Sequence, residues 1–133
     1  MRWSDLFIVL VVSHLAGDFM LQTEWQATMK SGGLGPDRER RRALASHVLT
    51  YALAFVPALV WIASQRSAAG VAAVLLTTFL PHGIQDDGRL LRAYVKKVKK
   101  VEPPTGSPLW IAIDQSFHIV ALLLTALLVG LAL

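Results

Sequence analysis

The apolar positions of the chain gather in four long blocks, and most charged positions gather in the gaps between them. Residues 43–65 and 67–85 contain no Asp, Glu, Lys or Arg, and residues 108–133 contain only Asp114. The first block is interrupted by an aspartate, but the helical pattern continues beyond it. A membrane-spanning helix needs about 20 mostly apolar residues. The pattern therefore predicts four spans, at about residues 5–27, 43–65, 67–85 and 108–133.

The connections between these blocks decide the predicted topology. Because they are short, neighbouring spans should run antiparallel. This predicts an all-α fold: a membrane-spanning four-helix up-down bundle that forms a single integral membrane domain over residues 1–133. A cleaved signal peptide is the alternative for the first block. We favour a span because Asp5 cancels the charge of Arg2 and no clean cleavage site follows.

Lysine and arginine are distributed unequally between the two ends of the predicted bundle. The 28–42 connection carries five of them and the 86–107 connection carries six, so eleven of the 13 lie on one side. Only Arg2 and Arg66 lie on the other side. The positive-inside rule then puts the long loops in the cytoplasm and both termini outside. We expect this orientation in a bacterial inner (cell) membrane.

The 86–107 connection has an amphipathic pattern of its own. Apolar residues recur at helical spacing from Leu91 to Val101, and basic residues lie largely between them. This pattern predicts a short interfacial helix on an anionic lipid surface, with a solvated basic loop as the alternative. The lipid-facing basic residues would be Arg92, Lys96, Lys97, Lys99 and Lys100.

Composition narrows the class of protein further. Of the 133 residues, 54% are hydrophobic, 17% are charged and none is cysteine. These values exclude a disordered chain, a disulfide scaffold and a thiolate metal site. The net charge of +4 follows from the basic loops. It therefore requires no nucleic-acid partner.

Each of the four histidines belongs to a different predicted span, and three of them lie four residues from an aspartate. The pairs are His14 with Asp18, His82 with Asp86, and Asp114 with His118, while His47 precedes Tyr51 at the same spacing. Residues four apart lie on one helix face. In an up-down bundle all these groups also lie at one level near the cytoplasmic face, with His14 about one turn deeper.

Ionisable groups at this position point to a metal. A charged aspartate near the bilayer centre costs about 2.5–3.5 kcal/mol, so such groups usually face the bundle interior and serve a function. Imidazole and carboxylate ligands suit zinc, manganese, iron or cobalt. The predicted ligands of one or two such ions are His14, Asp18, His47, His82, Asp86, Asp114 and His118. A proton or ion pathway and structural pairing of side chains are the alternatives.

Further polar residues accompany these candidates. Those predicted to support the ligands or to contact a substrate are Gln22, Tyr51, Gln85 and Gln115. Asp87 is interpreted as a solvated acid at a helix end, because the spacing from the preceding histidine favours Asp86 as the ligand.

Two prolines fall inside predicted spans. A proline lacks the N–H that would bond the carbonyl four residues earlier, so it kinks or opens a helix. Pro57 is expected to kink the second span. Pro81 directly precedes His82, so the third span is expected to bend or open where the candidate site lies.

Four motifs carry a resemblance to a known family. They are H-L-A-G-D-F-M-L-Q at 14–22 with Lys30 following, H-V-L-T-Y at 47–51, H-G-I-Q-D at 82–86 and D-Q-S-F-H at 114–118. Together they resemble the DUF3307 family of small bacterial membrane proteins of unknown function. The resemblance covers nearly the whole chain and implies this fold and this site, but no reaction. A looser likeness to bacterial membrane-bound metal-dependent hydrolases rests on His and Asp residues in short spans.

These observations lead to one functional hypothesis and two alternatives. We expect an integral membrane metal-dependent hydrolase that acts on a membrane lipid or a lipid-linked small molecule at the cytoplasmic leaflet. A metal or proton transporter would also use intramembrane His and Asp residues. A non-catalytic adaptor with a structural metal is the third reading. The chain could be a monomer or an oligomer.

Overall fold

The computed structural model describes residues 1–132, and every regular element in that range is helical. In chain order the elements are α1 (Trp3–Leu15), η1 (Ala16–Met20), α2 (Glu24–Met29), α3 (Arg38–Ala54), α4 (Val56–Ala63), α5 (Ala68–Asp86), α6 (Arg89–Tyr94), η2 (Val95–Lys99) and α7 (Pro108–Ala132). The two η elements are π-helical turns. The prediction of an all-α protein is confirmed.

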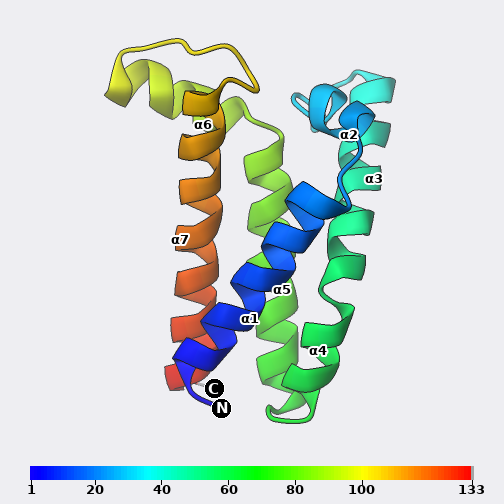
Figure 1. The fold of residues 1–133 in the computed structure, drawn as a ribbon, viewed down its shortest axis with the longest axis vertical. Coiled ribbons are helices and arrows are strands. Elements are labelled where there is room, and N and C mark those ends of the chain that lie inside the picture. The colour runs from blue at the N-terminus through cyan, green and yellow to red at the C-terminus, as the bar shows by residue number, and fades with distance from the viewer. Residues whose placement is uncertain (133) are drawn as a thin grey trace.

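The long helices pack side by side, with the short ones at one end (Figure 1). α5 packs against α7 on one side and against α3 and α4 on the other, while α1 crosses the group and contacts α7, α3 and α4. Both termini lie at one end of the molecule, and α2 and α6 lie at the opposite end (Figure 1). The segments that carry the candidate residues therefore reach the α2–α6 end together.

Three helical segments are long and apolar enough to cross a membrane: Trp3–Met20, Ala68–Asp86 and Pro108–Leu131. α3 and α4 pass the same test as a bent pair, which would make a fourth span. Apolar side chains on the outer faces of these helices are well exposed, among them Ile8 at 61%, Leu80 at 63% and Leu124 at 61%. Such apolar outer faces are typical of helices surrounded by lipid.

The first span is shorter than expected. The helix ends at Met20 in the π-helical turn η1 and does not run on to residue 27. Thr23 begins a separate helix, because its hydroxyl accepts a hydrogen bond from the Gln26 N–H and the Gln26 amide oxygen accepts one from the Thr23 N–H. This reciprocal capping box is visible in the sequence as Thr-x-x-Gln and is the signal that could have placed the break.

The segment predicted as the second span is bent, as Pro57 predicted. α3 begins at Arg38, earlier than expected, because the Asp37 carboxylate caps it by accepting hydrogen bonds from the next backbone N–H groups. The helix breaks at Phe55, and α4 continues at 49° to α3 with Pro57 in its first turn. The fixed backbone of proline suits the first turn of a helix.

The third span behaves differently from expectation, since α5 runs through Pro81 as one uninterrupted helix. The carbonyl that Pro81 leaves without its helical partner belongs to Thr77. The buried hydroxyl of Thr125 on α7 donates a hydrogen bond of 3.1 Å to that carbonyl. The neighbouring helix thus satisfies the freed group, which is how proline is tolerated inside a membrane helix.

The predicted basic helix is present as α6 and the following turn η2. Its apolar side packs inward, with Leu91 and Val95 buried against Trp110 of α7. The Arg92 guanidinium lies 5.4 Å from the centre of the Trp110 ring, a cation–π distance. The basic side chains Arg92, Lys96, Lys97, Lys99 and Lys100 are exposed. Their contact with lipid stays a prediction.

One apolar core occupies the half of the molecule nearer the termini. It includes Leu6 and Leu10 of α1, Ile62 of α4, and Ala126 and Val129 of α7, all buried. The buried polar side chains of the candidate site lie on the other side of this core, toward α2 and α6. The fold therefore separates an apolar half from a polar half.

Candidate functional site

The candidate residues reach one region from four helical segments. His14 and Asp18 lie at the end of the first span, His47 in α3, His82 and Asp86 in the last turns of α5, and Asp114 and His118 near the start of α7. Asp114 is the most accessible of the seven, with 18% of its side chain exposed, and each of the others is 5% exposed or less. The structure thus brings these groups together at one level, as the sequence predicted.

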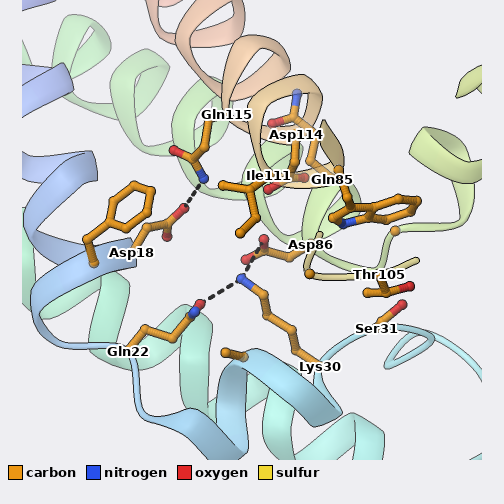
Figure 2. Close-up of a pocket in the computed structure, with 15 residues that line it drawn as sticks. Asp18, Gln22, Lys30, Ser31, Gln85, Asp86, Thr105, Ile111, Asp114 and Gln115 are labelled. Atoms are coloured by element: carbon orange, nitrogen blue, oxygen red, sulfur yellow. Dashed lines mark hydrogen bonds and ion pairs between the residues drawn. The ribbon is translucent and has the colours of Figure 1, made fainter. Parts of the chain in front are cut away.

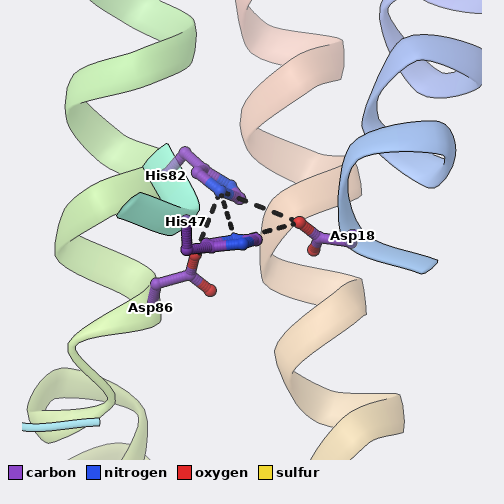
Figure 3. A group of neighbouring side chains, drawn as sticks. All are labelled: Asp18, His47, His82 and Asp86. Carbon is purple, nitrogen blue, oxygen red and sulfur yellow. Dashed lines mark hydrogen bonds and ion pairs between the residues drawn. The ribbon is translucent and has the colours of Figure 1, made fainter. Parts of the chain in front are cut away.

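Four of the seven form a compact set of possible metal ligands: Asp18, His47, His82 and Asp86 (Figure 3). One ligand atom from each lies within 4.8 Å of all the others. Asp86 Oδ2 is 2.8 Å from His47 Nε2 and 3.0 Å from His82 Nε2, while Asp18 Oδ1 is 3.4 Å and 3.8 Å from the same two nitrogens. Ligand atoms of a tetrahedral zinc site are about 3.3 Å apart, so these spacings bracket the required value.

Within the described chain, two carboxylate oxygens of this set lack hydrogen-bond partners. Asp18 Oδ1 and Asp86 Oδ2 are buried, and neither accepts a hydrogen bond of acceptable geometry. The Nε2 atoms of His47 and His82 face each other at 3.2 Å. Buried carboxylate oxygens without a partner are costly. A cation between these atoms would remove that cost.

A second group of possible ligands shares Asp86 with the first. It consists of Asp86, Asp114 and His118. His118 Nε2 is buried without a hydrogen-bond partner and lies 3.7 Å from Asp86 Oδ1, while His118 Nδ1 is 2.9 Å from the backbone oxygen of Asp114. The two oxygens of Asp86 therefore face different sets of groups.

His14 belongs to neither group. Its Nδ1 is 3.1 Å from the Tyr51 hydroxyl, and its Nε2 is 2.8 Å from the Gln115 amide oxygen. The Gln115 amide nitrogen in turn donates to Asp18 Oδ2 over 3.1 Å. The Tyr51 ring stacks on the His82 ring at 3.4 Å between centroids and 10° between planes. His14, Tyr51 and Gln115 thus hold Asp18 and His82 in position.

Lys30 is the functional residue that sequence reasoning missed. The sequence counted it as a cytoplasmic charge, but only 14% of its side chain is exposed, and its ammonium reaches into the site (Figure 2). Lys30 Nζ is 2.8 Å from Asp86 Oδ1, 3.3 Å from His47 Nε2 and 2.7 Å from Gln22 Oε1. Its place eight residues after the end of the first family motif was the available signal. Gln22 is the residue that supports this ammonium.

A pocket of about 300 Å³ opens beside these groups (Figure 2). Asp18, Asp86 and Asp114 line it together with Lys30, and apolar contacts come from side chains that include Phe19, Ile111 and Trp110. Gln22, Gln85 and Gln115 also line it. The arrangement offers a mixed polar and apolar cavity next to the candidate ligands.

Asp87 is not the solvated acid that the sequence suggested, because only 3% of it is exposed. It joins the loop before α3 to the start of α6, since its carboxylate accepts hydrogen bonds from the Leu34 N–H at 2.7 Å and from the Arg89 guanidinium. Burial opposes ionisation of Asp87, but these hydrogen bonds hold its pKa below the ordinary value. Its role is to fix the loop that follows Lys30.

Comparison with known proteins gives one match. Comparisons with curated proteins and with solved structures found no match to the chain. The likeness to membrane-bound hydrolases therefore stays a prediction. A family model described as "Protein of unknown function (DUF3307)" matches residues 6–132, which confirms the expected resemblance. The chain belongs to the DUF3307 family, whose description assigns it no activity.

Proposed function

We propose that this protein is an integral membrane metal-dependent hydrolase. Its four spans, with α3 and α4 counted as one, would form an up-down bundle in a bacterial inner membrane. The α2–α6 end carries eleven of the 13 lysines and arginines, which supports a cytoplasmic position for that end and an external position for both termini. The exposed apolar side chains on the helix surfaces support a lipid environment.

One observation carries the metal part of the proposal. Four buried ligand atoms, contributed by Asp18, His47, His82 and Asp86, lie within 4.8 Å of one another. The set of two imidazoles and two carboxylates suits zinc, manganese, iron or cobalt. Because the four residues come from three separate segments, an ion there would also hold η1, α3 and α5 together.

The surroundings of this set support hydrolysis. A divalent ion bound there would lower the pKa of a water molecule and polarise an ester, amide or phosphoryl bond. Asp114 is partly exposed, lines the pocket and lies outside the four-residue set, so it is our candidate for the general base. The pocket also has apolar walls, and in the proposed orientation it would lie at the level of the cytoplasmic headgroups, which favours an amphipathic or lipid-linked substrate.

The distribution of polar groups favours an enzyme over a transporter. A transport path needs polar groups along the whole depth of the bundle. The half nearer the termini is instead filled by the apolar core that contains Leu6, Leu10, Ile62 and Val129. A pocket open toward one end suits a substrate that enters and leaves by the same face.

Metal analysis of the protein purified in mild detergent tests the proposal. We expect about one zinc, manganese, iron or cobalt ion per chain and loss of that ion in His82→Ala. Thr78→Ala is the matched control, because Thr78 is buried one turn away in α5 and its hydroxyl has no hydrogen-bond partner. Absence of any stoichiometric transition metal would refute the metal centre.

The reaction needs its own experiment. The metal-loaded protein should hydrolyse a chromogenic ester, amide or phosphodiester that carries an acyl chain, and Asp114→Asn should lower the rate about 100-fold or more while the ion is retained. A metal-loaded protein that cleaves none of these compounds, but carries zinc or protons into proteoliposomes, would replace the hydrolase with a transporter.

A further inference from the structure

The two oxygens of Asp86 face two different sets of partners. Oδ2 faces His47 and His82, at 2.8 Å and 3.0 Å. Oδ1 faces His118 at 3.7 Å and accepts a hydrogen bond of 2.8 Å from Lys30. A carboxylate in this position is typical of one that bridges two cations about 3.5–4 Å apart. The ammonium of Lys30 bonds Oδ1, the oxygen that would face the second cation of such a pair, and it also lies 3.3 Å from His47 Nε2.

Lys30 is held at this place from several directions. The Gln22 amide oxygen accepts a hydrogen bond of 2.7 Å from its ammonium. Its backbone ends α2, which is fixed to α3 because the buried Gln26 amide donates to Ser46 Oγ over 2.9 Å. The loop after it is tied down by the Gly32 N–H, which donates to the Asp87 backbone oxygen over 2.8 Å. A lysine anchored in this way is part of the site and not a surface charge that happens to reach it.

The charges of the site balance with one metal ion and this ammonium. Three aspartates, Asp18, Asp86 and Asp114, line the pocket, and Lys30 is the cationic side chain among the residues described there. One divalent ion together with one ammonium neutralises three carboxylates. Two divalent ions and the ammonium would leave two excess positive charges, which is less favourable in an apolar bundle than the single excess charge of two ions without the ammonium.

We propose that the Lys30 ammonium is the resident second cation of the site and excludes a second metal ion from Asp86, Asp114 and His118. The proposal rests on the metal centre proposed above and specifies its composition as one metal ion and one ammonium. Lys30 and two of the proposed metal ligands, Asp18 and Asp86, line the same pocket, so the centre would suit a substrate with an anionic group next to the bond that is cleaved. In this arrangement Lys30 is a substrate-contacting residue and His118 is not a metal ligand.

Zinc stoichiometry tests this composition without any knowledge of the substrate. The full-length protein in detergent is saturated with zinc, separated from free ion and analysed for metal per chain. The wild type should hold one ion. Lys30→Met removes the ammonium but keeps a side chain of similar length, so the vacated position should admit a second zinc ion and the stoichiometry should rise to two. Adding His118→Ala to Lys30→Met should return it to one.

Two controls separate this proposal from the one on which it rests. Arg42→Met removes an exposed positive charge from α3 and should leave one ion per chain. His118→Ala alone should also leave one ion, whereas His82→Ala should leave none. Two ions in the wild type, or one ion in a folded Lys30→Met variant, would overturn the role of Lys30 while the metal centre stands. No ion in the wild type would overturn both.

If Lys30→Met fails to fold, two zinc ions per chain in the wild type would still refute the proposal. Lys30→Gln then serves as the second variant, because its shorter and uncharged side chain takes the positive charge away from Asp86 but keeps a polar group at this position. Helical content measured by circular dichroism identifies the folded variants. A second zinc ion in Lys30→Gln supports the proposal, and a single ion there contradicts it.

Discussion

Gly17→Ala is the sharpest probe of how the fold positions the site. A Cβ at Gly17 would lie 2.6 Å from Tyr51 Cδ2 and 3.3 Å from Tyr51 Cα, so the added methyl group meets both the ring and the backbone of α3. Restoring an ordinary contact of 3.4 Å requires a movement of about 0.8 Å. The buried ring cannot yield freely, because it is stacked on His82 at 3.4 Å.

This overpacking should cost about 1–3 kcal/mol of stability. It should also disturb the metal site, since ligands must be held within about 0.5 Å of their working positions and the displaced ring presses on His82. We expect the apparent melting temperature in detergent to fall by several degrees and zinc affinity, measured by competition with a chelating dye, to fall about tenfold, which corresponds to about 1.4 kcal/mol.

Gly83→Ala is the matched control for this substitution. Gly83 is adjacent to His82, but a Cβ there meets Val48 Cγ2 at 3.6 Å, an ordinary contact. Alanine inside a helix is favoured over glycine by about 1 kcal/mol, so this variant should be at least as stable as the wild type and should bind zinc normally. If Gly17→Ala matched Gly83→Ala in melting temperature and zinc affinity, the argument from close packing would be refuted.

Three further predictions concern single contacts. Asp86→Asn should abolish stoichiometric zinc binding, because Asp86 faces both groups of candidate ligands, and metal analysis showing a retained ion would contradict its assignment. Thr125→Val should cost about 0.6–1.7 kcal/mol, because the Thr77 carbonyl loses its donor; denaturation in detergent measures this, and an unchanged stability would mean that the carbonyl finds another partner. Asp87→Asn should weaken the contact with the Leu34 N–H and cost about 1 kcal/mol at pH 7. Folding lowers the pKa of Asp87, so the stabilisation by its ionised carboxylate is present above the ordinary carboxyl pKa and is lost as the pH falls below it. The wild type and Asp87→Asn should therefore become equally stable in acid. A difference in stability that did not change with pH would exclude the ionised carboxylate as its cause.

Much of the fold could be predicted from the sequence, because hydrophobicity and helical spacing are local properties. The third and fourth apolar blocks begin and end within one residue of α5 and of the described part of α7. The kink at Pro57 follows from the chemistry of proline alone. Pro81 shows the limit of the same rule, because a hydroxyl on another helix satisfies the carbonyl that this proline frees.

The gathering of His and Asp side chains was also readable from the sequence. Spacing by four residues puts each pair on one helix face, and antiparallel spans bring the pairs to one level. The sequence could not say which of the seven groups share one centre, because that depends on the rotation and tilt of each helix. His14 has the same spacing to Asp18 as His82 has to Asp86, yet its nitrogen is 3.8 Å from that carboxylate and its closer partners are Tyr51 and Gln115.

The sequence by itself determined the apolar helices, the side on which the basic loops lie and the histidine–aspartate pairs, since each follows from residues close together in the chain. Only the tertiary structure decided the partners of those pairs. It placed Lys30 against Asp86, which is 56 residues later in the chain, and it buried Asp87 against the loop before α3. Both contacts join segments distant in sequence, so their energies depend on packing that local pattern does not contain. The proposed composition of the centre, one metal ion and one ammonium, rests on the first of them.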